Sequence, residues 1–247
     1  MAKHAQPNDI IDRISLAETL EAITGTLKYM AATGCKGFDC SPEQLATIEN
    51  LDALPGAQPA NLEGIQSAVR ACERCDLSKT RTQTVFGEGN SRARLVFIGE
   101  GPGYEEDQQG RPFVGAAGQL LTKIIQAMGL TREDVYIGNI IKCRPPGNRN
   151  PAPDEIAACL PYLERQLEAI QPEYICALGA VATQTLLNTD APISRLRGRL
   201  HSYGKISLMP TFHPAYLLRN PDKKRDVWED MQVLMREMGL QRPNSGS

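Results

Sequence analysis

The residues of this sequence best suited to chemistry stand inside or directly after short apolar runs. One run leads into Gly99-Glu-Gly-Pro-Gly103, which carries Glu100 and is soon followed by Glu106. Another run carries Asn139, and a third is followed by His213. Carboxylates transfer protons, an amide both donates and accepts hydrogen bonds, and an imidazole can donate to a developing negative charge. If the fold brings these groups together in one pocket, they could bind a polar ligand and act on it.

The apolar runs predict the strands that would position these groups. Each run is short and largely apolar on both faces, as buried parallel strands are, and helical stretches lie between the runs. This alternation predicts a three-layer α/β/α fold with a central, mostly parallel four-stranded sheet. Ligands then bind at the carboxyl ends of the strands. The predicted strands cover residues 95–99, 135–141, 174–178 and 206–211, and the predicted helices cover 116–128, 153–170, 180–188 and 223–239.

The glycine-rich stretch at 99–103 matches neither of two common phosphate-binding motifs. A dinucleotide fingerprint requires glycine where Tyr104 stands, and the Gly-Lys-Ser/Thr of a P-loop is absent. We therefore interpret these glycines as letting the backbone approach a bound ligand closely.

Four of the seven cysteines are spaced like metal ligands. Cys72 and Cys75 form a CxxC pair, Cys143 follows, and Cys159 comes after 15 intervening residues. In a reducing compartment such a set indicates metal ligation rather than disulfides. Zinc and an iron–sulfur cluster both suit four thiolates. Cys176 lies inside a predicted strand and is expected to be an inert core residue.

Composition favours an ordinary globular protein in the cytoplasm. Hydrophobic residues make up 41% of the 247 residues, charged residues 23%, and the net charge is −2. No run approaches the roughly 18 apolar residues of a membrane span, and the polar N-terminal residues do not resemble a secretory signal.

Charge is unevenly distributed along the chain. Residues 1–60 contain 4 Lys or Arg against 8 Asp or Glu. Their pattern predicts a helix over 8–30, followed by a linker rich in Gly, Pro and Ala over 31–60. Residues 191–221 contain no acidic residue and five basic ones, which suits either a solvated face or a phosphate-binding strip. The basic residues are Arg195, Arg197, Arg199, Lys205 and Arg219.

Three motifs together resemble the uracil-DNA glycosylases. They are Gly-Glu-Gly-Pro-Gly at 99–103, Gly-Arg-Pro-Phe-Val-Gly at 110–115 and His-Pro-Ala at 213–215. With the four spaced cysteines, the chain resembles family 4, the iron–sulfur type, over about residues 65–240. The resemblance implies a glycosylase domain over 61–242 with a [4Fe–4S] cluster held by the four cysteines, preceded by a helical extension and linker over 1–60.

The resemblance also implies a role for each residue of the predicted pocket. Asn139 would read the Watson–Crick edge of a flipped uracil, and Phe113 would stack on its ring. His213, with backbone N–H groups around Gly101, would stabilise negative charge on the leaving base. One of Glu100 and Glu106 would orient water, while Glu106 could instead close off the C5 position against thymine.

The expected partner is uracil-containing DNA, bound by a monomer. Leu217 or Leu218 would wedge into the base stack, while Arg219 and the basic strip of Arg195, Arg197 and Arg199 would hold phosphates. No lysine stands at the predicted pocket, so a monofunctional enzyme of base excision repair is expected rather than a lyase. One alternative is a non-catalytic, cluster-bearing module that binds uracil or DNA and is associated with a polymerase. The other is a glycosylase or hydrolase for a different base or a free nucleotide. Residues 1–60 could bind a replication or repair protein.

Overall fold

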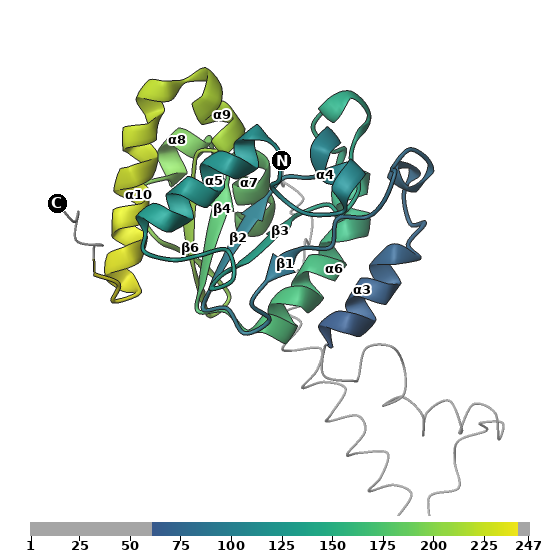
Figure 1. Ribbon diagram of the computed structural model, residues 1–247, viewed down its shortest axis with the longest axis horizontal. Helices are drawn as coiled ribbons and strands as arrows, with labels where there is room; N and C mark the ends of the chain where they lie inside the picture. The colour runs from purple at the N-terminus through teal and green to yellow at the C-terminus, as the bar shows by residue number, and fades with distance from the viewer. Residues whose placement is uncertain (1–60, 242–247) are drawn as a thin grey trace, which may run out of the picture. The chain divides into compact units, whose positions relative to one another are not determined.

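A mixed six-stranded sheet forms the centre of the part that the computed structural model describes, residues 61–241 (Figure 1). The strand order is β1-β3-β2-β4-β6-β5, with β3, β2, β4 and β6 parallel and both edge strands antiparallel to their neighbours. The strands are β1 (Glu88–Gly89), β2 (Leu95–Gly99), β3 (Tyr136–Asn139), β4 (Tyr174–Leu178), β5 (His201–Tyr203) and β6 (Ile206–Thr211).

The four parallel strands are the four that the apolar runs predict, and the three-layer α/β/α class is confirmed. The predicted count of four strands is incomplete, because β1 and β5 extend the sheet at its two edges. These edge strands have two and three residues and include no buried residue, so they leave no apolar run in the sequence. Their pairing depends on neighbours that fold back beside them.

Helices cover both faces of the sheet. One face packs against α6 and α7 through residues such as Leu163, Leu167 and Leu186, and the other packs against α5, α9 and α10 through residues such as Leu121 and Met231. Figure 1 shows α10 and α6 on opposite sides of the strands. The α-helices are α3 (Leu62–Arg70), α4 (Tyr104–Gln109), α5 (Ala116–Ala127), α6 (Pro153–Ile170), α7 (Ala180–Leu187), α8 (Ile193–Leu196), α9 (Pro214–Arg219) and α10 (Lys224–Glu237), and the short 3-10 helices are η2 (Asp76–Lys79), η3 (Pro146–Asn148) and η4 (Pro221–Lys223).

The register of the parallel strands brings their carboxyl ends to one edge. Gly99 at the end of β2 pairs with Asn139 at the end of β3, and Leu178 at the end of β4 pairs with Thr211 at the end of β6. Connections on one face lead from β2 to β3, whereas α6 on the other face leads from β3 to β4 on the far side of β2. Such a reversal opens a crevice at the strand ends.

Several expectations fall on residues outside the described range. The predicted helix over 8–30, the linker over 31–60 and the proposed partner site in residues 1–60 lie there, and they remain predictions. Within residues 61–241, none of the helices combines the length and apolar character needed to cross a bilayer.

Candidate active site

A cavity of about 410 Å³ lies at the carboxyl ends of the parallel strands. All six residues predicted to bind or act on the base line it, together with Arg219 from the predicted DNA surface. The six come from the loop after β2, helix α4, the turn before α5, the end of β3 and the start of α9: Glu100, Gly101, Glu106, Phe113, Asn139 and His213. The predicted convergence of these side chains is therefore observed.

Asn139 is positioned by β3 and presents an unused hydrogen-bond acceptor. Its side chain is 1% exposed, and its Oδ1 atom has no hydrogen-bond partner among residues 61–241. A buried polar atom without a partner costs about 1–3 kcal/mol. A ligand in the cavity that donates a hydrogen bond to this oxygen would recover that cost.

Two glycines of the loop after β2 allow this close arrangement. A Cβ atom on Gly99 would lie 2.5 Å from Asn139 Oδ1 and 2.5 Å from Phe113 Cζ. A Cβ atom on Gly101 would lie 2.7 Å from Ile141 Cγ1. Any side chain at either position would displace residues that line or support the cavity, so glycine is required at both.

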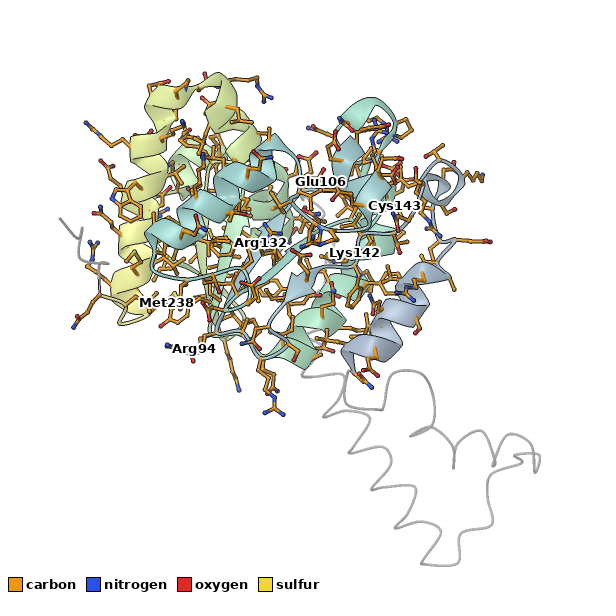
Figure 2. All side chains as sticks on the ribbon, in the orientation of Figure 1. Arg94, Glu106, Arg132, Lys142, Cys143 and Met238 are labelled. Atoms are coloured by element: carbon orange, nitrogen blue, oxygen red, sulfur yellow. The ribbon has the colours of Figure 1, made fainter. Side chains whose placement is uncertain are left out.

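Phe113 is held in an unfavourable backbone conformation beside the cavity. Its φ of 52° lies in the left-handed region that non-glycine residues rarely adopt. Arg132 holds this turn through bonds to Phe113 O at 3.2 Å and Pro112 O at 2.8 Å, and itself pairs with Glu88 at 2.7 Å (Figure 2). The Phe113 ring centroid lies 5.7 Å from that of His213. Sequence reasoning missed Arg132, because its partners are distant in the chain.

His213 caps α9 with its side chain, and this fixes its chemistry. Its Nδ1 atom accepts a hydrogen bond from Ala215 N at 3.1 Å. Burial, assisted by the positive charge of Arg219, lowers the pKa of the imidazole to about 4. The ring is therefore neutral at pH 7, and because Nδ1 accepts, its proton is on Nε2. This leaves Nε2–H as a donor.

The two carboxylates of the cavity have different surroundings. Glu106 accepts three backbone hydrogen bonds, from Gly103 N at 3.1 Å, Val114 N at 2.9 Å and Gly115 N at 3.0 Å. It thus ties the loop after β2 to the turn before α5. Glu100 makes no side-chain hydrogen bond or ion pair within residues 61–241, and burial raises the pKa of its carboxyl. Of the two, Glu100 is the one whose carboxylate oxygens have no hydrogen-bond partner within residues 61–241.

A buried lysine supports the strand end from behind. Lys142 is fully buried, its Nζ donates to Asn139 O at 2.8 Å, and burial lowers its pKa to about 8 (Figure 2). The residue lines the cavity of the cysteines rather than the one that contains Asn139. Among residues 61–241, the lining of the active-site cavity includes no lysine.

The two leucines predicted to form a DNA wedge differ in their exposure to solvent. Leu217 is 1% exposed and packs in the core beneath α9, so it cannot enter a base stack without leaving that core. Leu218 is 47% exposed. Successive residues of a helix point in different directions, so Leu217 faces the core while Leu218 faces solvent.

The basic strip also divides into structural and exposed residues. Arg197 forms two hydrogen bonds to the buried carboxylate of Asp230, at 3.0 and 2.8 Å. The guanidinium is thus engaged by a buried charge, which leaves it less available to a phosphate than the sequence predicts. Arg195 and Arg199 are exposed, and Arg219 lines the cavity.

The loop after β3 contributes more to the cavity than the sequence suggests. Pro145, Asn148, Arg149 and Asn150 line it, as does Tyr216 from α9. The loop forms η3 and then leads into α6. The motifs did not place these residues in the cavity, because only the folded loop brings them to its rim.

The four spaced cysteines line a second, smaller cavity. Cys72, Cys75, Cys143 and Cys159 surround it as free thiols. Arg81 Nη1 donates to Cys143 Sγ at 3.2 Å, and Lys142 N donates to Cys159 Sγ at 3.2 Å. As the side chains stand in residues 61–241, no group of three or more His, Cys, Asp or Glu is arranged to hold a metal ion. Four thiols with N–H donors at two of them nevertheless form a donor set suited to an iron–sulfur cluster.

Cys176 differs from these four. It lies in β4, is fully buried, and burial raises the pKa of its thiol well above the usual value. A buried thiol of this kind is unreactive, as the sequence predicts.

Comparison with known proteins identifies the family. A family model described as the uracil DNA glycosylase superfamily matches residues 86–232. The type-4 uracil-DNA glycosylase of Saccharolobus solfataricus is 48% identical over 181 residues, 70% of this chain and 84% of the relative. The type-4 enzyme of Thermotoga maritima is 48% identical over 69% of this chain and 91% of the relative. That of Archaeoglobus fulgidus is 43% identical over 74% of this chain and 96% of the relative. The chain belongs to the uracil-DNA glycosylase superfamily and, within it, to the type-4 family.

Proposed function

We propose that this protein removes uracil from DNA by hydrolysing its N-glycosidic bond, which yields free uracil and an abasic site. The relatives that it resembles over most of their length are type-4 uracil-DNA glycosylases. The observation that carries the proposal is the unpaired, buried Oδ1 of Asn139 in the same cavity as the Nε2–H of His213. The protein is a monofunctional glycosylase of base excision repair.

Uracil is selected by its hydrogen-bonding edge. An extruded uracil presents N3–H as a donor and O4 as an acceptor, so the amide of Asn139 can accept from the first and donate to the second. Cytosine has the opposite pattern at both positions. The ring of Phe113 supports the face of the base, and its fixed backbone preorganises that surface.

Bond cleavage requires stabilisation of the leaving base. The C1′–N1 bond breaks with its electron pair retained by uracil, and negative charge develops on O2. His213 donates from Nε2 to that oxygen as a neutral imidazole, with backbone N–H groups around Gly101 assisting. Water adds to C1′ and loses a proton, while the departing uracil anion takes one up.

Glu100 is the proposed water-orienting carboxylate, and Glu106 is a positioning residue. Glu100→Gln is expected to slow the single-turnover rate at saturation by roughly 100-fold with an unchanged Tm, as loss of a general base does. Glu106→Gln is expected to lower Tm by weakening backbone bonds worth about 1–3 kcal/mol. Single-turnover kinetics and thermal unfolding of both variants test this assignment. A stable, active Glu100→Gln variant would exclude Glu100 from the role.

DNA binding is assigned to the exposed residues around the cavity. Leu218 would fill the space left by the extruded base, and Arg219, Arg195 and Arg199 would contact phosphates. The protein acts as a monomer in the cytoplasm, where thiols stay reduced and DNA is present. Residues 1–60 are proposed to precede the glycosylase domain of 61–242 and to bind a replication or repair protein.

The four cysteines around the second cavity would hold a [4Fe–4S] cluster. Such a cluster would supply a structural link between the segment before β2, the loop after β3 and α6. The loop of residues 144–150 would thereby be held at the rim of the active site. Arg81 and the backbone N–H of Lys142 already donate hydrogen bonds to two of the sulfurs.

Replacing Cys72 with serine is expected to remove the cluster and most of the soluble protein. Anaerobically purified wild type should be brown and contain iron and acid-labile sulfide in equal amounts, whereas Cys72→Ser should be pale and low in both. Cys176→Ser is the matched control, because that thiol is buried away from the others and should leave the iron content unchanged. Colourless wild-type protein that contains zinc would overturn the assignment of the metal.

The activity is tested with an oligonucleotide that contains one uracil. Excision followed by alkali treatment should cut the strand at that site. The Asn139→Ala variant serves as the matched negative control. A parallel substrate containing cytosine should remain intact, because cytosine reverses both hydrogen bonds to Asn139, whereas excision of hypoxanthine or thymine in place of uracil would indicate an enzyme for another base. Intact uracil strands with tight DNA binding would instead indicate a non-catalytic module, an alternative that the family membership does not favour.

A further inference from the structure

Two large apolar side chains are notably exposed on residues 61–241, and both stand beside the active site. They are Tyr104, 54% exposed, and Leu218, 47% exposed. Tyr104 is the first residue of α4, next to the cavity-lining Gly103, and Leu218 lies on α9, which His213 caps. Leu218 already has a proposed role as the wedge. Tyr104 has none in the mechanism described above.

The Tyr104 ring has a cation on one side. The guanidinium carbon of Arg144 lies 5.1 Å from the ring centroid, within the range of a cation–π contact. Arg144 Nε also donates to Asn148 Oδ1 at 2.7 Å, and Asn148 lines the active-site cavity. The contact therefore joins α4 to the loop after β3 at the cavity rim. Arg144 has no carboxylate partner within residues 61–241, so its remaining N–H groups are available.

Local charge indicates which part of DNA could contact this ring. Glu105 follows Tyr104 and is exposed, so its negative charge offsets the positive charge of Arg144 and the start of α4 offers a phosphate no net attraction. Contact with the uncharged face of a nucleobase does not depend on such an attraction. Base–aromatic stacking tolerates any base, because every base has a π-face.

Base extrusion also creates a need for such a surface. When uracil leaves the stack, the base beside it loses a stacking partner, which is part of the cost of flipping. An aromatic ring at the rim can replace that partner. An arginine behind the ring strengthens the platform and can reach the adjoining phosphate.

We infer that Tyr104, backed by Arg144, is a stacking platform for the nucleobase adjacent to the extruded uracil on the same strand. The inference rests on the proposed function, since it assumes that uracil enters the cavity from a DNA strand. It assigns Tyr104 to substrate positioning. Its contribution belongs to binding, because the ring does not touch the bond that breaks.

The test compares Tyr104→Ala with Tyr104→Phe, which keeps the ring. Substrates are single-stranded oligonucleotides with one uracil and either a normal base or an abasic tetrahydrofuran residue on its 5′ or 3′ side. On the normal substrate, Tyr104→Ala is expected to raise the half-saturating concentration about 5- to 100-fold, with an unchanged single-turnover rate at saturation. Tyr104→Phe should behave like wild type. Thermal unfolding of both variants controls for damage to α4.

The abasic substrates identify the stacked base. Wild type should lose affinity when the base on one side of uracil is missing, and Tyr104→Ala should lose nothing further on that substrate. Equal effects of Tyr104→Ala on all three substrates, or a wild type that is insensitive to both missing bases, would overturn the inference. Equilibrium binding of matching oligonucleotides that carry 2′-fluoro-2′-deoxyuridine, whose electronegative fluorine disfavours the cationic sugar and so slows cleavage, gives the same comparison without excision. Failure of excision therefore contradicts the proposed function alone, whereas loss of the affinity pattern contradicts the platform alone.

Discussion

Replacing Asn139 with alanine is expected to reduce single-turnover excision of uracil by about a thousandfold or more. Sites that read a substrate through buried hydrogen bonds discriminate by factors of roughly 10⁴–10⁵, since an incorrect partner leaves buried groups unpaired. The amide of Asn139 is fully buried with Oδ1 unpaired. Its removal costs both uracil contacts and leaves a cavity behind the base. Selectivity for uracil over cytosine should fall together with the rate.

Asn139→Asp separates hydrogen bonding from packing. The aspartate has nearly the same volume and retains an acceptor at Oδ1, but it has no amide donor for O4 of uracil. We expect a large loss of uracil excision, and the burial of an ionisable carboxyl without a partner should also lower thermal stability. Rates are measured under single-turnover conditions on oligonucleotides with uracil, cytosine or thymine at one position. A rate near that of wild type for Asn139→Ala would show that another group reads the base.

The elements that position this asparagine could be predicted because their signals are local. The bounds predicted for β2 and β4 are those observed, and so are those of α6. Continuous apolar runs identify buried parallel strands. The start of α6 has proline and two acids in its first turn, which is a local signal as well. In contrast, β1 and β5 lack such a run, since they form only where neighbouring strands offer an edge.

The site was predictable in its residue types and much less in its supporting contacts. The motifs predicted that four side chains meet in one pocket, and all four line the same cavity: Glu100, Glu106, Asn139 and His213. The three backbone bonds to Glu106 could not be foreseen, because they depend on the detailed path of two loops. Periodicity over the six residues of α9 could not decide which leucine faces the core.

Arg197 shows most clearly how a charge can mislead. In the sequence it belongs to a run of basic residues without acids. In the structure its partner is Asp230, 33 residues later in the chain, on α10. Asp230 also accepts from the hydroxyl of Thr211 at 2.6 Å. Arg197 therefore belongs to a buried hydrogen-bond network with Asp230 and Thr211, which only the tertiary fold brings together.

Replacing His213 with alanine is expected to slow cleavage by about 100- to 1,000-fold. Loss of one donor to a developing oxyanion has that magnitude elsewhere. DNA affinity should change only a few-fold, because the bond to O2 gains most of its strength as charge develops. Single-turnover rates on a uracil oligonucleotide, and equilibrium binding of one with a cleavage-resistant 2′-fluoro-2′-deoxyuridine, measure the two effects separately. Equal losses in rate and affinity would contradict a role in stabilising the anion.

The pH dependence of the wild type provides a second test of the same role. Since burial lowers the pKa of His213 to about 4, the imidazole stays neutral from pH 5 upward, and excision should show no titration near 6.5 from this residue. Between about pH 4 and the unfolded pKa near 6.5, the unfolded chain binds a proton that the folded chain does not. Acidification through this range therefore favours unfolding, and stability attributable to this group falls as pH falls.

His213→Gln tests whether a donor alone is sufficient. A glutamine amide can donate a hydrogen bond toward O2 and cannot carry a charge at any pH, so partial recovery of the rate over His213→Ala is expected. The destabilisation between pH 6.5 and 4 should be smaller in this variant, because its unfolded chain has lost the imidazole that takes up the proton. If the wild-type rate instead rises steeply as pH falls through 6.5, a charged imidazolium is the active form. The neutral donor fixed by the cap of α9 would then be the wrong species.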